Sequence, residues 1–142
     1  NSLLSRVVAF VASLPAPQSP TSARGALLFA STGCATCHQP VLPLAKGGEA
    51  RMFTDLLLHD LGPGLADTLP EPGAAASEWR TAPLAGLSDA LSRRTGLLHD
   101  GRASSVEEAV LWHGGQAERA VRRFQALPRR EKEALLAYVG RL

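Results

Sequence analysis

The sequence has few cysteines, few aromatic residues and no marked excess of either charge. Only two of its 142 residues are cysteine, which excludes a disulfide framework and a zinc site built from four thiolates. Fifteen basic residues nearly balance thirteen acidic ones, and the lack of a long basic run argues against a nucleic-acid partner. Aromatic residues make up 5% of the chain, so a bound apolar group could fill part of the hydrophobic core that aromatic side chains do not fill. No apolar run approaches the length needed to cross a membrane.

The length and composition are typical of one folded domain, with hydrophobic residues at 45% and charged residues at 20%. The chain begins at Asn1, without an initiator methionine or a signal-peptide pattern. We therefore expect a removed leader or a domain of a longer protein. Apolar spacing predicts a helix over 3–14, which three prolines within 15–20 end. We assign 1–23 to this helix and a proline-rich linker, and 24–142 to the main domain.

The remaining pattern predicts an all-α domain with long irregular loops. A helix is expected over 22–31, and 39–103 is rich in glycine and proline with little periodicity. Ser105 and Glu108 match a capping box for a helix over 106–113, which Gly114 and Gly115 stop. Two further helices follow, over 116–127 and after Pro128, the second with Leu135, Leu136, Tyr138 and Val139 facing inward.

The segment 34–38 reads Cys-Ala-Thr-Cys-His, the attachment signature of a c-type haem. Two thiols three residues apart can add to the two vinyl groups at one porphyrin edge, and the following histidine is then aimed at the iron. The competing interpretation is a redox dithiol of the thioredoxin type, which would need a βαβ pattern that the sequence lacks. We predict one covalent haem on Cys34 and Cys37 with His38 as an iron ligand. The preceding GALLFASTG resembles the first helix of a class I cytochrome, which implies that Gly25 and Phe29 pack on the C-terminal helix.

The second axial position decides whether such a haem carries electrons or binds small molecules. His113 has the best positional argument, because it lies on the same helical face as the apolar Val106, Ala109 and Val110 and so points inward. We predict it as the second ligand, and a hydrogen-bonded core histidine is the plain alternative. The other side chains able to bind iron are Lys46, Met52, His59, His99 and Tyr138.

Four other polar residues are assigned to the haem surroundings. For His59, which Asp60 could orient, we favour a hydrogen bond to a haem propionate or a backbone carbonyl, and His99 beside Arg102 has the same two options. Arg80 and Arg102 are candidates to pair with the propionates, with solvated arginines as the alternative.

Four motifs in order resemble the C-terminal haem domain of the bacterial di-haem oxidoreductases, relatives of the di-haem cytochrome c peroxidases. They are CATCHQP, FTDLLLHDLGPGLAD, EWRTAPLAGL and LLHDGRASSVEEAVLWHGG, within 24–142. The resemblance implies a class I cytochrome c-like fold, thioether bonds at Cys34 and Cys37 and a proximal His38. It places His113 where the related peroxidases often have a distal methionine, and so implies a bis-histidine haem. Those enzymes carry two haem sites, whereas this chain has one attachment motif.

We therefore expect an electron-transfer domain whose partner is a redox protein or a second haem domain. The alternatives are a peroxidase-like or oxidase domain, with His59 or His99 as a distal acid–base group, and a haem-bearing sensor module of a larger protein. Because haem is attached covalently outside the bacterial cytoplasmic membrane, we expect a periplasmic or exported protein.

Overall fold

Helices form most of the regular structure, but short strands accompany them. The computed structural model describes residues 2–15, 20–69 and 71–142. Most of the predicted proline-rich linker, 16–19, lies outside the described residues. In the described part of the chain the helices are α1 (Ser2–Ser13), α2 (Ala23–Thr32), α3 (Leu87–Ser92), α4 (Val106–Trp112), α5 (Glu118–Ala126) and α6 (Arg129–Val139). Short 3₁₀ turns lie at Cys34–Thr36, Pro63–Leu65 and Gly115–Ala117.

Two small antiparallel sheets correct the prediction of an all-α fold. Strand β1 (Leu42–Pro43) pairs with β2 (Glu49–Ala50), and β3 (Leu58–Asp60) pairs with β4 (Glu78–Arg80). In the second sheet His59 lies opposite Trp79. Strands of two or three residues are too short to show an alternating pattern in the sequence, which is why the prediction missed them. The same irregular region also contains α3, which was not predicted.

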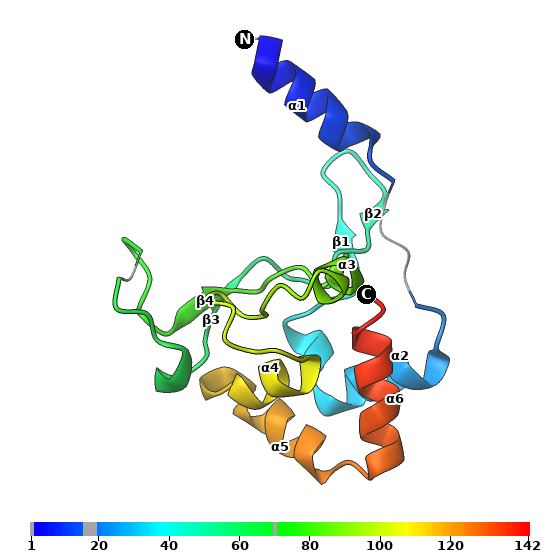
Figure 1. Cartoon of the computed structure of the whole chain (residues 1–142), viewed down its shortest axis with the longest axis vertical. Helices are drawn as coiled ribbons and strands as arrows, with labels where there is room; N and C mark the ends of the chain where they lie inside the picture. The colour runs from blue at the N-terminus through cyan, green and yellow to red at the C-terminus, as the bar shows by residue number, and fades with distance from the viewer. Residues whose placement is uncertain (1, 16–19, 70) are drawn as a thin grey trace.

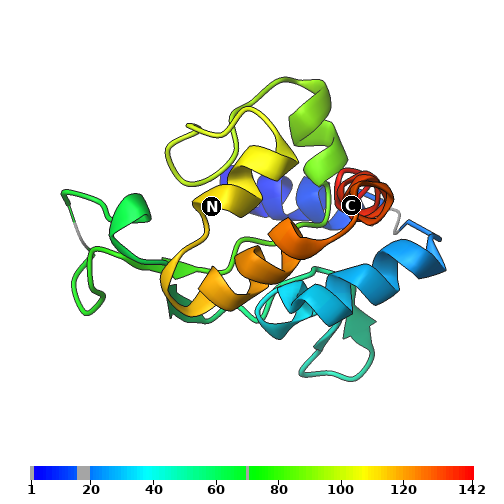
Figure 2. The ribbon, with the colours of Figure 1, turned by 90° about the horizontal axis from the view of Figure 1, so that it is seen from below.

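The central packing contact joins α2 to α6 (Figure 1). A Cβ at Gly25 would lie 2.3 Å from the Cβ of Tyr138, so this glycine allows the two helices to cross closely. The ring centroids of Phe29 and Tyr138 are 5.8 Å apart. The predicted contact of Gly25 and Phe29 with the C-terminal helix is confirmed. Figure 2 shows α6 end-on, between α2 and α3.

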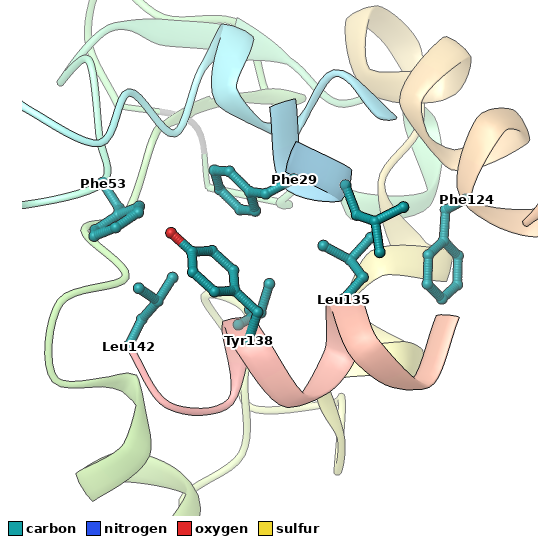
Figure 3. Packing of buried hydrophobic residues seen from close by; sticks show 8 residues of the cluster. Phe29, Phe53, Phe124, Leu135, Tyr138 and Leu142 are labelled. Atoms are coloured by element: carbon teal, nitrogen blue, oxygen red, sulfur yellow. The ribbon is translucent and has the colours of Figure 1, made fainter. Parts of the chain in front are cut away.

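The buried core lies around α6 (Figure 3). Phe53, from the irregular region, contributes to it, and its ring centroid is 5.9 Å from that of Phe29. The cluster comprises Leu28, Phe29, Phe53, Phe124, Leu135, Tyr138, Val139 and Leu142. The inward face predicted for the last helix is confirmed for Leu135, Tyr138 and Val139, while Leu136 is only half-buried. The core therefore fixes α2, and with it the start of the segment 34–38.

The first helix contributes nothing to this core. Helix α1 forms where predicted, but none of its residues is buried, and it lies apart from the other helices in Figure 1. Its apolar side chains, which the pattern suggested would face a core, are exposed. None of the helices in the described ranges is long and apolar enough to cross a membrane.

Candidate haem-binding site

The two cysteines follow directly on α2. Gly33 caps this helix in a left-handed conformation, and the chain then makes a 3₁₀ turn that ends with the His38 amide donating to the Cys34 carbonyl oxygen at 3.0 Å. Both thiols are half-buried and free. Burial raises the pKa of Cys34, and burial together with the charge of Asp55 raises the pKa of Cys37. A thioredoxin-type dithiol depends instead on a lowered thiol pKa, so these surroundings do not favour that alternative.

His38 is half-buried and is held by the backbone of a buried residue. Its Nδ1–H donates to the carbonyl oxygen of Phe53 at 3.1 Å. Burial, together with the nearby His113, lowers the pKa of His38 to about 4. The imidazole is therefore neutral at neutral pH. Because Nδ1 carries the proton, Nε2 holds a lone pair, which is the form of histidine that binds metals.

His113 is held in the same way at the end of α4. Ser105 begins this helix as predicted, its hydroxyl accepting from the Glu108 amide at 3.1 Å, and His113 follows the last helical residue as the C-cap. The Nδ1–H of His113 donates to the Ala109 carbonyl oxygen at 2.7 Å. Burial lowers the pKa of this imidazole as well. It is also neutral, with the lone pair on Nε2.

The two imidazoles lie close together. Their ring centroids are 6.5 Å apart, and the ring planes are inclined by 55°. A metal–imidazole bond of roughly 2 Å on each side of one ion would place the ring centroids roughly 6 Å apart. Two neutral, tethered imidazoles at this separation, with two free thiols beside one of them, fit a haem held by two thioethers and two axial nitrogens.

His59 lies close to Cys37 but is engaged elsewhere. Its Nε2–H donates to Asp55 Oδ2 at 2.8 Å, and its Nδ1–H donates to Gln116 Oε1 at 2.9 Å. Burial opposes protonation of His59, but these hydrogen bonds raise its pKa. Burial would raise the pKa of Asp55, yet the bonds from the Leu57 amide and from His59 lower it to about 2. Although Cys37, Asp55 and His59 lie close enough to share a metal ion, the last two form an ion pair.

The other polar candidates lie in β4 and in the segment between α3 and α4. His99 stacks on Trp79, with ring centroids 3.7 Å apart. Arg102 pairs with Asp100, donates to the Gly64 carbonyl oxygen at 2.8 Å and lies over the ring of Trp112, the residue before His113. Arg80 donates to the Leu56 carbonyl oxygen at 2.6 Å. The structure thus brings His38 and His113 together and gives His59, His99 and both arginines protein partners.

The remaining candidates for the second ligand have other surroundings. Tyr138 is buried in the core against Phe29 and Phe53. Lys46 is exposed on the turn between β1 and β2. Met52 is half-buried, and its carbonyl oxygen accepts from the amides of Leu84 and Ala85. Among the described side chains able to bind iron, His113 is the one whose ring is paired with that of His38.

The comparison with protein families decides the relationship of the chain. A family model described as di-haem oxidoreductase, putative peroxidase, matches residues 4–142. The chain belongs to this family. The match confirms the resemblance read from the four motifs, and the family description implies haem binding and oxidoreductase chemistry. No curated protein and no solved structure gives a significant match.

In this di-haem oxidoreductase domain, three site contacts were missed by sequence reasoning. Asp55 lies four residues before His59, a spacing that could have suggested the ion pair. Gln116 is 57 residues from His59, and no local pattern signals their contact. The carbonyl of Phe53 reaches His38 because Phe53 adopts a left-handed backbone with φ 53°, which is uncommon for an aromatic residue.

Proposed function

We propose that this chain is a c-type cytochrome domain that carries electrons through one covalent haem with His38 and His113 as axial ligands. The observation that carries the proposal is the pair of half-buried imidazoles, 6.5 Å apart, whose Nδ1 atoms are both tied to backbone carbonyls. Cys34 and Cys37, four and one residues before His38, would supply the two thioether bonds. The helices would then surround the haem as in a class I cytochrome c.

The role of the chain in this chemistry is to bind the haem and to orient the two histidine rings. A bound haem supplies one-electron exchange between ferric and ferrous iron. The hydrogen bonds from His38 to Phe53 and from His113 to Ala109 fix each ring and keep its Nε2 unprotonated. His38 and His113 would thus both hold the iron from the chain, and one-electron exchange would require no proton donor among the chain's residues. Two nitrogen ligands are expected to give a lower potential than a histidine–methionine pair.

The arginines remain candidates for the haem carboxylates. Arg102 uses Nε and Nη1 in its bonds to Asp100 and Gly64, and Arg80 uses Nη1 in its bond to Leu56. A guanidinium has five N–H donors, so each side chain keeps donors that could bind a propionate.

A peroxidase-like domain is the alternative that the family description favours. It would require an open or displaceable axial position, with His59 or His99 as the acid–base group. Both nitrogens of His59 are bonded to protein acceptors, and His99 stacks on Trp79. The contact of His38 with His113 supports the electron-transfer function more directly.

The experiment uses the haem-loaded protein and its His113→Ala variant. The wild type is expected to retain haem under denaturing conditions, to give a low-spin ferric spectrum and to resist carbon monoxide when reduced. His113→Ala is expected to become high-spin and to bind carbon monoxide. His99→Ala serves as the matched histidine control and should keep the low-spin spectrum. A high-spin wild type, or a His113→Ala spectrum identical to the wild type, would contradict the assignment.

The partner and the location follow from this function. A chain with one attachment motif in a di-haem family points to a second haem domain or a redox protein as the electron partner. Covalent haem attachment points to the bacterial periplasm or to export.

A further inference from the structure

His59 connects two segments that the sequence keeps far apart. On one side it bonds Asp55, whose carboxylate and the His59 ring both lie near the thiol of Cys37. On the other side it bonds Gln116, three residues after His113. The side chains of Asp55 and His59 are only 5% and 19% exposed. The Asp55–His59 bond is therefore sheltered, whereas the His59–Gln116 bond is exposed. Together the two bonds link the attachment segment to the segment that follows the second candidate ligand.

The hydrogen-bond partners of His59 determine the protonation state of its ring. The Asp55 carboxylate and the Gln116 carbonyl oxygen are both acceptors, so the imidazole satisfies them by donating through both nitrogens. A doubly protonated ring has no lone pair for a metal. This state excludes His59 as an iron ligand and gives its two bonds the added strength of charge-assisted hydrogen bonds.

The backbone around this link is in direct contact. The Gly114 amide donates to the Leu61 carbonyl oxygen at 3.1 Å. A Cβ at Gly115 would lie 2.4 Å from the Asp60 carbonyl oxygen, so the two backbone segments touch with no side chain between them. The residues after His113 therefore rest on the residues after His59, and the side chain of Gln116 returns to the His59 ring.

We propose that His59 is a positioning residue that holds His113 opposite His38 by bridging Asp55 and Gln116. The inference rests on the proposed axial ligation, to which it adds a residue outside the ligand set. His113 is the C-cap of a helix of only seven residues, and that helix has no buried residue. Val106 and Val110 of that helix are half-buried against the core, and the Ala109 carbonyl orients the His113 ring. The contacts on the C-terminal side of His113, with the His59–Gln116 bond among them, add the restraint that so short a helix lacks at its end.

The test compares Gln116→Leu with Gln116→Glu in the haem-loaded full chain. Gln116→Leu removes the acceptor but leaves the Asp55–His59 pair intact, and we expect a high-spin fraction in the ferric spectrum and about tenfold tighter carbon monoxide binding when reduced. Gln116→Glu keeps an acceptor oxygen and is expected to restore the wild-type spectrum and carbon monoxide affinity. His59→Phe, which removes both bonds, should change the spectrum at least as much as Gln116→Leu.

Gln125→Leu, the same substitution on the exposed side of α5, is the matched control and should leave the spectrum unchanged. Far-UV circular dichroism confirms that each variant is folded. If Gln116→Leu keeps the wild-type spectrum and carbon monoxide affinity, His59 does not position His113. That outcome differs from failure of the proposed function, in which the wild type itself is not low-spin or His113→Ala leaves its spectrum unchanged.

Discussion

Replacing Gly25 by alanine tests the contact that fixes the start of the attachment segment. The new Cβ would lie 2.3 Å from the Cβ and 2.7 Å from the Cγ of Tyr138. The Cβ of Tyr138 cannot rotate away, so α2 and α6 must separate, since carbon atoms pack at roughly 3.5–4.0 Å. Overpacking of a core costs about 1–3 kcal/mol. Alanine recovers up to about 1 kcal/mol in helix propensity. Because the clash involves a Cβ that cannot rotate away, the cost lies at the upper end of this range, at about 3 kcal/mol, and we expect a net loss of about 2 kcal/mol in the free energy of unfolding.

Thermal and denaturant unfolding of the haem-loaded protein, followed by circular dichroism, measures this loss. A decrease of about 2 kcal/mol corresponds to a Tm about 5–10 °C lower. Gly64→Ala is the matched control, because a Cβ there meets only the Trp112 ring at the ordinary contact distance of 3.7 Å. Its stability should stay within about 0.5 kcal/mol of the wild type. A Gly25→Ala protein as stable as the wild type would show that the α2–α6 crossing is not closely packed at this point.

Two further substitutions test contacts near the site. Asp55→Asn should lower the free energy of unfolding by about 1–2 kcal/mol at pH 5–6. The pKa of Asp55 is lowered to about 2, so its contribution is complete above its usual value of 3.8 and is lost as the pH falls toward 2. The raised pKa of His59 makes its contribution complete below 6.5 and lost as the pH rises through that raised value. Unfolding of both proteins measured from pH 2 to 9 should show the largest loss of stability between these two pKa values. A loss of the same size at every pH would contradict the prediction. Thr54→Val removes a fully buried hydroxyl that donates to the Thr81 carbonyl oxygen at 2.7 Å and accepts from the Leu56 amide at 2.9 Å. Denaturant unfolding should show a loss of about 2–3 kcal/mol, whereas the exposed Thr95→Val should be nearly neutral, and equal effects at the two sites would oppose the reasoning.

Helices with strong periodicity or capping could be predicted from the sequence. The capping hydroxyl of Ser105 and the inward face of α6 are determined by residues within one or two turns, and both are present. The sequence also contained the signal for the close approach of α2 to α6, in Gly25 and Phe29. The cap and the helix face arise from residues close together in the sequence. The helix crossing was signalled by Gly25, a residue type that is used inside helices mainly where another helix approaches closely.

The features that were missed depend on contacts between distant residues. Strands of two residues, such as Leu42–Pro43, are defined by their partners rather than by a pattern of their own. The amphipathic pattern of 3–14 predicted the helix but could not show that nothing in the described chain covers it. For the same reason the sequence offered His59 as a candidate for several roles, and only its contacts with Asp55 and Gln116 distinguish between them.

The placement of His38 and His113 has a consequence for the unfolded chain. Between them lies the region of short strands and loops, and of its described residues Phe53 is the one buried member of the main core cluster, while Leu84, Leu87, Val106 and Val110 are half-buried against it. Under the proposed ligation, a metal bound by both histidines closes a loop of roughly 75 residues. A cross-link of that length lowers the entropy of the unfolded ensemble by an amount worth about 4 kcal/mol while both bonds persist. The haem would thus act as a cross-link for a region with little core of its own. Because the thioether bonds would keep the haem on the attachment segment, loss of the His113 bond is the step that would release the conformational entropy of this region.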